Sequence, residues 1–238
     1  MKTAFVIPAY EAEKSVGVVV SDLISRITPE LETTRPAVIV VDDGSRDATA
    51  QRAEQAGAHV LRHVGNRGKG AALLTGFRYA AALSGDVVVT LDADGQHPPE
   101  QAIALARHPA SPEALVLGIR DLRRAGAPRA NRFSNGFSNL WVSGFSRQRL
   151  NDTQCGLRRY PLAAIASLGL AGSGFELESE VIIKAARAGV PIEQVPVEVI
   201  YPAAEERVSH FDSVRDPARI VARILYTAAT TSFKRAPR

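Results

Sequence analysis

The chain has 238 residues, 45% of them hydrophobic and 23% charged, with a formal net charge of +4. This composition is ordinary for a soluble globular protein with a real core. The single cysteine, Cys155, excludes an internal disulfide and suits a reducing cytosol. The apolar run at residues 1–8 is too brief for a signal peptide, and no stretch approaches the ~20 apolar residues of a membrane span. We therefore expect a cytoplasmic protein, either free or resting on the cytoplasmic face of a membrane.

Strand and helix patterns alternate through the first half of the chain. Short apolar runs predict strands, and apolar residues at helical spacing predict helices. The expected strands are 3–8, 37–41, 58–61 and 86–91, and the expected helices are 14–27, 47–55 and 70–83. This order predicts an α/β fold with a mostly parallel sheet and helices on both faces. Ligands bind such sheets beyond the carboxyl ends of the strands, so the polar clusters there are expected to converge.

The second half has a looser pattern. It begins with an arginine-rich segment, 119–131, that we expect to be a loop. A helix follows, in which Phe133, Phe137, Leu140 and Trp141 stand at helical spacing. The expected elements are helices 131–145, 176–188 and 214–230 and a strand at 192–200. No repeat or linker divides the chain, so a single domain is expected over residues 1–238. Its amphipathic C-terminal helix, at about 214–231, either packs on the sheet or docks on an anionic membrane.

Positive charge is concentrated in the middle of the chain. Residues 118–160 contain nine arginines and two aspartates, whereas residues 161–238 contain nine basic and nine acidic residues. Such a block suits phosphates, either of a small ligand or of lipid headgroups. The alternative is a solvated loop with incidental charge. Nucleic acid is not an expected partner, because the block lacks the interleaved aromatic residues of a stacking surface.

Two aspartates separated by one residue follow the strand at 86–91. Asp92 and Asp94 can both face a hard cation if the backbone turns there, and Gln96 can add a neutral oxygen ligand. Mg²⁺ or Mn²⁺ bound by one or two carboxylates typically also binds substrate phosphates. The alternative is a turn whose aspartates only cap the helix that starts near Pro98.

Two further clusters lie in the first half. Asp42, at the end of a strand, can accept a hydrogen bond from a nucleobase N–H or from ribose hydroxyls. The segment 65–70 (Gly-Asn-Arg-Gly-Lys-Gly) combines cations with glycines that allow close backbone approach to a ligand. It matches neither a Walker loop nor a dinucleotide-binding fingerprint, which argues against an NTPase or a dehydrogenase.

The motifs in this order resemble family 2 glycosyltransferases of the GT-A fold. They are Ile7-Pro8-Ala9-Tyr10, Val41-Asp42-Asp43-Gly44-Ser45, Asn66-Arg67-Gly68-Lys69-Gly70 and Leu91-Asp92-Ala93-Asp94-Gly95-Gln96-His97. Two later motifs, Asn151-Asp152-Thr153-Gln154-Cys155-Gly156-Leu157-Arg158 and Phe175-Glu176-Leu177-Glu178, resemble the branch that glycosylates polyprenyl phosphates. Dolichyl-phosphate glucosyltransferase and mannose synthase belong to that branch. The resemblance covers roughly residues 4–220.

The resemblance implies a role for each matching position. The nucleoside would be held by Pro8, Tyr10 and Asp42. Lys69 and Asp92 would lie near the ribose and diphosphate, and Asp94, with Asp92 and Gln96, would hold Mg²⁺ or Mn²⁺. Arg120 and Arg132 would bind the acceptor's phosphate. A late loop with Arg207, Ser209 and His210 would close over the donor diphosphate.

The acceptor decides whether the reaction needs a base. A sugar hydroxyl must lose a proton as it attacks, whereas a lipid phosphate is already anionic and needs positioning and charge screening. Asp152 and Glu178 are the candidate base or sugar-hydroxyl ligands, and the residues expected to act in catalysis are Asp92, Asp94, Arg120, Arg132 and Asp152. The expected function is metal-dependent, inverting transfer of a hexose from a UDP- or GDP-sugar to a polyprenyl phosphate by a peripheral membrane enzyme. The alternatives are a hydroxyl acceptor, or a protein that binds nucleotide-sugar without turnover.

Overall fold

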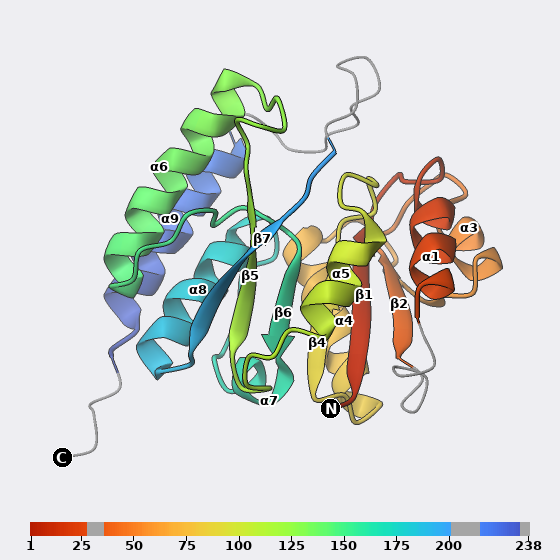
Figure 1. The fold of residues 1–238 in the computed structure, drawn as a ribbon, viewed down its shortest axis with the longest axis horizontal. Helices are drawn as coiled ribbons and strands as arrows, with labels where there is room; N and C mark the ends of the chain where they lie inside the picture. The colour runs from red at the N-terminus through yellow and green to blue at the C-terminus, as the bar shows by residue number, and fades with distance from the viewer. Residues whose placement is uncertain (28–35, 201–214, 234–238) are drawn as a thin grey trace.

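A computed structural model describes residues 1–27, 36–200 and 215–233. Its centre is a seven-stranded sheet of order β3-β2-β1-β4-β6-β5-β7 (Figure 1). The strands are β1 (Thr3–Ala9), β2 (Ala37–Asp42), β3 (His59–Arg62), β4 (Val87–Thr90), β5 (Leu115–Arg120), β6 (Arg158–Pro161) and β7 (Ile192–Val197). Only β6 runs antiparallel to its neighbours, β4 and β5. The predicted fold, a mostly parallel α/β sheet, is therefore confirmed.

Helices cover both faces of this sheet. The helices are α1 (Val16–Ser25), α3 (Thr49–Gln55), α4 (Lys69–Ala82), α5 (Pro99–Ala106), α6 (Arg129–Ser146), α7 (Leu162–Ala166), α8 (Glu176–Ala188) and α9 (Arg215–Thr230). One apolar cluster joins α1, α3 and α5 to the sheet, and the other joins α4, α6, α7, α8 and α9 to it. Strand β1 feeds both clusters, since Val6 packs on one face and Phe5 and Ile7 on the other. Strands covered in this way read as continuous apolar runs.

Several sequence-based boundaries were wrong. The segment 119–131 is not all loop, because β5 extends to Arg120 and α6 begins at Arg129. Strand β7 ends at Val197 rather than at residue 200. Strand β6 was not predicted, because its first two residues, Arg158 and Arg159, are charged yet fully buried. The hydrophobic pattern therefore gives no strand signal there.

The C-terminal helix α9 packs mainly on another helix rather than directly on the sheet. Ile220 and Ile224 are buried in the core cluster shared with α8, whereas Leu225 and Tyr226 are exposed. Of the two alternatives for this helix, packing against the protein is therefore observed for one face of α9, although its main partner is α8. No described helix is long and apolar enough to cross a bilayer.

Candidate active site at the strand ends

The predicted polar clusters meet at one edge of the sheet. Strands β1, β2, β4 and β5 are aligned in the same direction, and they end at Ala9, Asp42, Thr90 and Arg120 respectively. Strand β6 runs in the opposite direction and starts at this edge, where Arg158 pairs with Thr90. The site is thus assembled from segments far apart in the sequence, which project from both halves of the chain.

Lys69 joins two carboxylates at the centre of this edge. Its Nζ lies 2.7 Å from Oδ1 of Asp92 and 3.2 Å from Oε1 of Glu178. Burial alone would lower the pKa of Lys69, but the charges of Asp92 and Glu178 raise it above its ordinary value. Burial would likewise raise the pKa of Asp92, but Lys69 holds it below its ordinary value. These contacts therefore keep Lys69 cationic and Asp92 anionic at neutral pH.

Gly156 leaves room for the Asp92 carboxylate. A Cβ atom on Gly156 would lie 2.5 Å from Oδ2 of Asp92, far closer than such atoms approach each other. Thr90, at the end of β4, donates a hydrogen bond to the carbonyl of Gly156 at 2.6 Å. The loop before β6 therefore lies directly against the metal-ligand candidate, a contact that the sequence analysis missed.

Asp94 differs from Asp92 in its surroundings. Its side chain is solvent-exposed, and Oδ1 accepts a hydrogen bond from the backbone N–H of Gln96 at 2.9 Å. Desolvation by the protein packed around it, followed by the charge of Asp92, raises the pKa of Asp94 to about 6. No ion pair of Asp94 occurs within the described residues. A carboxylate that is repelled by another carboxylate and lacks a cation of its own suits a divalent metal.

The described residues contain no group of three or more histidine, cysteine, aspartate or glutamate side chains arranged to hold a metal. A metal held by the expected ligands Asp94, Asp92 and Gln96 would therefore need further oxygen ligands, such as those of a bound diphosphate. Asp94 is the better placed of the two carboxylates, since Lys69 already contacts Asp92.

The two aspartates after β2 have separate contacts. Asp42 is fully buried; its Oδ1 accepts the N–H of Ser45 at 2.9 Å, whereas its Oδ2 lacks a hydrogen bond. Nε of Arg62 lies 3.1 Å from this Oδ2 as an ion pair. Asp43 instead accepts hydrogen bonds from the N–H groups of Arg67 and Gly68 and contacts Nδ1 of His63 at 2.6 Å. Asp43 therefore holds the glycine-rich loop, while Asp42 pairs with Arg62 and has one oxygen, Oδ2, without a hydrogen bond.

Two glycines of that loop, Gly68 and Gly70, lie against protein backbone, whereas a Cβ on Gly65 would meet nothing within 4 Å. A Cβ on Gly68 would lie 2.5 Å from the carbonyl oxygen of Ser173, and one on Gly70 would lie 2.7 Å from that of Gly174. At Gly68 and Gly70 the protein backbone itself requires glycine, and the expected approach of a ligand to this loop stays a prediction. These two glycines let the start of α4 pack against the turn before α8, and this packing places Lys69 beside Glu178.

Arg120 and Asp152 form a second ion pair. Nε of Arg120 lies 2.7 Å from Oδ2 of Asp152, and its Nη2 lies 3.1 Å from Oδ1. The Asp152 side chain is fully buried, and its Oδ1 also accepts the N–H of Gln154. With both oxygens held in this way, Asp152 is poorly placed to act as a base and well placed to orient the Arg120 guanidinium.

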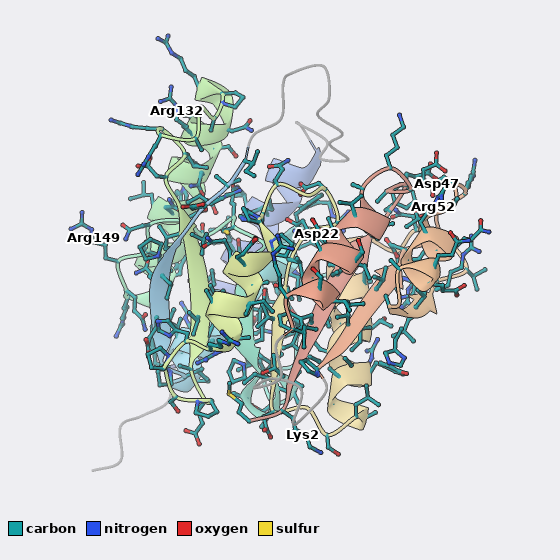
Figure 2. All side chains as sticks on the ribbon, turned by 45° about the vertical axis from the view of Figure 1, so that its right-hand side comes forward. Lys2, Asp22, Asp47, Arg52, Arg132 and Arg149 are labelled. Carbon is teal, nitrogen blue, oxygen red and sulfur yellow. The ribbon has the colours of Figure 1, made fainter. Side chains whose placement is uncertain are left out.

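The remaining expected residues divide into three cases. Pro8 is buried in β1, and Tyr10 is half-buried just beyond the end of that strand. Arg132 lies near the start of α6, on the outside of the molecule (Figure 2), and no contact joins it to Arg120 within the described residues. Arg207, Ser209 and His210 lie outside the described residues.

Two supporting groups were missed by the sequence analysis. Arg158 is fully buried and donates hydrogen bonds to three backbone carbonyls, those of Cys155, Glu178 and Thr153, at 2.7–2.9 Å. It ties the loop that carries Asp152 to the helix that carries Glu178. On α8, Glu176 and Glu180 accept hydrogen bonds from backbone N–H groups of the turn 171–174. The alternation of glutamates at 176, 178 and 180 was the sequence pattern that could have pointed to these supporting contacts.

Cys155 and His97 pack beneath the site. Cys155 is fully buried, and burial raises the pKa of its thiol to about 12. Its Sγ lies 3.8 Å from Nε2 of His97, which is also buried. Both residues thus have the packing roles that a lone buried cysteine and its neighbour usually have.

Comparisons with known proteins agree with this geometry. The sequence profile described as glycosyl transferase family 2 matches residues 4–172. The chain is 31% identical over 203 residues to an uncharacterized protein of Methanocaldococcus jannaschii, covering 82% of this chain and 80% of that one. It is 29% identical to the undecaprenyl-phosphate mannosyltransferase of Micrococcus luteus, covering 83% of each chain.

Among solved structures, the fold resembles glucosyl-3-phosphoglycerate synthase from Mycobacterium tuberculosis in complex with Mn²⁺, UDP and glucosyl-3-phosphoglycerate. The TM-score is 0.69 at 24% identity, covering 96% of this chain and 80% of that one. At this identity the likeness concerns the fold alone. The profile match, the sequence relatives and the fold together lead to one conclusion: the chain belongs to glycosyl transferase family 2 and has the GT-A fold.

Proposed function

We propose that this glycosyltransferase moves a hexose from a UDP- or GDP-sugar to a polyprenyl phosphate at a membrane surface, with inversion at the anomeric carbon. Family membership supports the transferase activity, and relatives that act on polyprenyl phosphates support the acceptor class. The single observation that carries the choice of acceptor is the ion pair between Arg120 and Asp152.

The donor half of the proposal rests on Asp42 and Lys69. Oδ2 of Asp42 is buried and accepts no hydrogen bond, although Nε of Arg62 forms an ion pair with it at 3.1 Å, and the adjacent strand end carries Pro8 and Tyr10. A base N–H or a ribose hydroxyl would satisfy this oxygen. The cation of Lys69 would lie near the diphosphate, and Glu178, which holds Lys69 at 3.2 Å, would accept hydrogen bonds from the ribose or the sugar.

Asp94, with Asp92 and Gln96, would hold Mg²⁺ or Mn²⁺. When bound, the metal would offset the negative charge that develops on the departing nucleoside diphosphate. The solved structure with Mn²⁺ and UDP supports this proposal as an analogy of fold. The protein's own contribution is to keep Asp92 anionic beside Lys69, so that the diphosphate end of the donor meets a fixed arrangement of charges.

The choice of a phosphate acceptor also rests on the two candidate bases, because both carboxylates already have cationic partners. Both oxygens of Asp152 are held by Arg120, and Oε1 of Glu178 is paired with Lys69. A hydroxyl acceptor would need a carboxylate free to take its proton, whereas a phosphate monoester attacks through an oxygen that is already anionic. Arg120, oriented by Asp152, would bind that phosphate, and the new bond to the anomeric carbon would form as the bond to the diphosphate oxygen breaks.

A hydroxyl acceptor is the second candidate function. It is favoured by the likeness of the fold to glucosyl-3-phosphoglycerate synthase, whose complex contains glucosyl-3-phosphoglycerate, a compound with both a phosphate and a glycosylated hydroxyl. A protein that binds nucleotide-sugar without turnover is a third candidate.

The test is a transfer assay with Mn²⁺, labelled UDP- and GDP-sugars chosen by thermal shift, and three acceptors. Undecaprenyl phosphate is compared with undecaprenol, which lacks only the phosphate, and with 3-phosphoglycerate. We expect transfer to undecaprenyl phosphate alone. Transfer to the alcohol or to phosphoglycerate, without transfer to the lipid phosphate, would establish the second candidate. Donor binding without release of nucleoside diphosphate from any acceptor would favour the third.

A further inference from the structure

Helix α6 presents its apolar side to solvent and its polar side to the protein. The exposed stripe consists of Phe133 (79% exposed), Leu140 (71%), Phe137 (45%) and Trp141 (41%). The buried positions on the opposite side are Asn135, Ser138, Val142 and Ser146, three of which are polar. An ordinary surface helix has the reverse arrangement, with its apolar stripe facing the core.

The polar inner face has an identifiable task. Oδ1 of Asn139 accepts a hydrogen bond from the N–H of Thr153 at 2.8 Å, and its Nδ2 donates to the carbonyl of Asn151 at 2.7 Å. Oγ of Ser138 lies 2.9 Å from Oγ1 of Thr153. These contacts fix the loop that carries Asp152. They explain why the inner face is polar, and they leave the outer aromatic stripe without a role inside the protein.

The outer stripe is continuous rather than scattered. The rings of Phe137 and Trp141 lie 6.1 Å apart, edge to face, and Phe133 and Leu140 lie about one turn before and after Phe137. Single exposed apolar residues are normal on soluble proteins, but grouped ones mark interaction sites. In Figure 1, α6 lies at one end of the molecule, opposite the end formed by α1 and α3, so the stripe faces outward along its length.

Arginines surround this stripe at both ends of the helix. Residues 122–151 contain six arginines and no aspartate or glutamate. Arg123, Arg124, Arg129 and Arg132 lie at or before the start of α6, and Arg147 and Arg149 follow its end. Figure 2 shows Arg132 and Arg149 on the outer side of the molecule. A patch that combines aromatic side chains with unopposed cations is complementary to an anionic bilayer, whose headgroup region offers phosphates above an apolar interior.

We propose that the outer face of α6 docks on an anionic lipid bilayer, with the helix lying in the plane of the headgroups. An 18-residue helix is about 27 Å long, so the arginines at its two ends would contact separate headgroups while the aromatic stripe enters the acyl boundary. The use of this docking surface, access to a lipid acceptor, rests on the proposed function. The inner face of α6 holds the loop of Asp152, the partner of Arg120, so docking would hold the proposed acceptor site next to the bilayer.

Vesicle binding tests this surface without donor or acceptor. Sedimentation would compare vesicles of phosphatidylcholine alone with vesicles that also contain phosphatidylglycerol. We expect wild-type protein to bind the anionic vesicles, and the double variant Phe133→Ser/Leu140→Ser to bind them roughly tenfold or more weakly. The variant Arg123→Gln/Arg124→Gln should lose roughly fivefold per arginine, with the loss suppressed at high salt.

A double variant at two exposed valines distant from α6, Val18→Ser/Val64→Ser, is the matched control and should bind as wild type does. Circular dichroism melts would show that each variant is folded. Three results would overturn the proposal: no binding of wild type to anionic vesicles, equal binding by the Phe133/Leu140 variant, or a wild-type dimer in light scattering that this variant dissociates. The last result would assign the stripe to a second copy of the chain.

Transfer assays distinguish a failure of the docking proposal from a failure of the proposed function. The Phe133→Ser/Leu140→Ser variant should retain its rate on a short, water-soluble polyprenyl phosphate and lose most of its rate on a long-chain acceptor in vesicles. Equal loss on both acceptors would contradict docking as the cause. Wild type that binds vesicles but glycosylates neither acceptor would overturn the proposed function and leave the docking surface standing.

Discussion

Arg120 and Asp152 face each other through two contacts, with Nε 2.7 Å from Oδ2 and Nη2 3.1 Å from Oδ1. Bidentate pairs of this kind fix the plane of the guanidinium as well as its position. Since the Asp152 side chain is fully buried and the Arg120 side chain is 14% exposed, the carboxylate is the fixed partner and sets the orientation of the arginine. The pair therefore separates a positioning role for Asp152 from a base role.

The variant Asp152→Asn should raise the KM for the lipid acceptor about tenfold or more and leave the shape of the pH–rate profile unchanged, because the amide no longer orients Arg120. Steady-state kinetics across pH would measure both effects, with Asp121→Asn, an exposed residue one position beyond β5, as the control. If Asp152 were a base, kcat would instead collapse and the remaining rate would rise with pH.

Replacing Lys69 by methionine should destabilise the fold and abolish donor binding. The change leaves Asp92 and Glu178 facing each other without their shared cation, and removing one partner of a buried ion pair costs about 3 kcal/mol or more. Urea unfolding and titration with UDP would measure the two losses. Lys14→Met, at an exposed lysine in the loop before α1, should change neither quantity. A Lys69→Met protein as stable as wild type would show that the bridge contributes little.

Mn²⁺ binding should weaken as the pH falls through about 6. The metal binds the ionised carboxylate of Asp94, whose pKa is raised to about 6, so protonation below that value competes with the metal. We expect the affinity measured with UDP present to be nearly constant above pH 7 and to fall about tenfold per pH unit well below 6. Asp94→Asn should remove both the binding and its pH dependence, whereas Asp22→Asn on α1 should preserve them. An affinity that is flat between pH 5 and 7 would contradict Asp94 as a ligand.

The same shift has a consequence without metal. The folded protein binds the Asp94 proton more tightly than the unfolded chain, whose pKa is near the ordinary 3.8. This group therefore favours folding below pH 3.8, and that contribution is lost as the pH rises through about 6. Saturating metal should restore stability in the upper part of this range, which thermal melts with and without Mn²⁺ would detect.

A methyl group added at Gly156 should disable the site. Its Cβ would lie 2.5 Å from Oδ2 of Asp92, so the carboxylate must move away from Lys69. We expect Gly156→Ala to lower kcat/KM about a hundredfold, the scale of loss for small displacements of catalytic groups. The matched control is Gly144→Ala in α6, where an added Cβ meets nothing within 4 Å and alanine favours the helix by about 1 kcal/mol. Full activity of Gly156→Ala would show that Asp92 has freedom to move.

Local sequence was sufficient for the first four strands and for the position of the site. Residues 38–41 and 87–91 form uninterrupted buried runs, and Asp42 and Asp92 follow directly where these runs end. Parallel strands then bring those ends together without further information. The partners of Lys69 were not predictable in the same way, because Glu178 lies more than a hundred residues away and reaches Lys69 only when the turn 172–174 packs on Gly68 and Gly70.

Helix α6 shows the same division. The spacing of Phe133, Phe137, Leu140 and Trp141 predicted a helix from the sequence alone, since helical periodicity is a local property. The sequence did not determine which side of that helix packs. The loop 151–153 requires hydrogen-bond donors and acceptors, so the polar side turns inward to Asn151 and Thr153 and the aromatic side is left in solvent. Periodicity reveals that a helix has two faces, but only the tertiary contacts decide which one is buried, because burial depends on what the rest of the chain offers at that place.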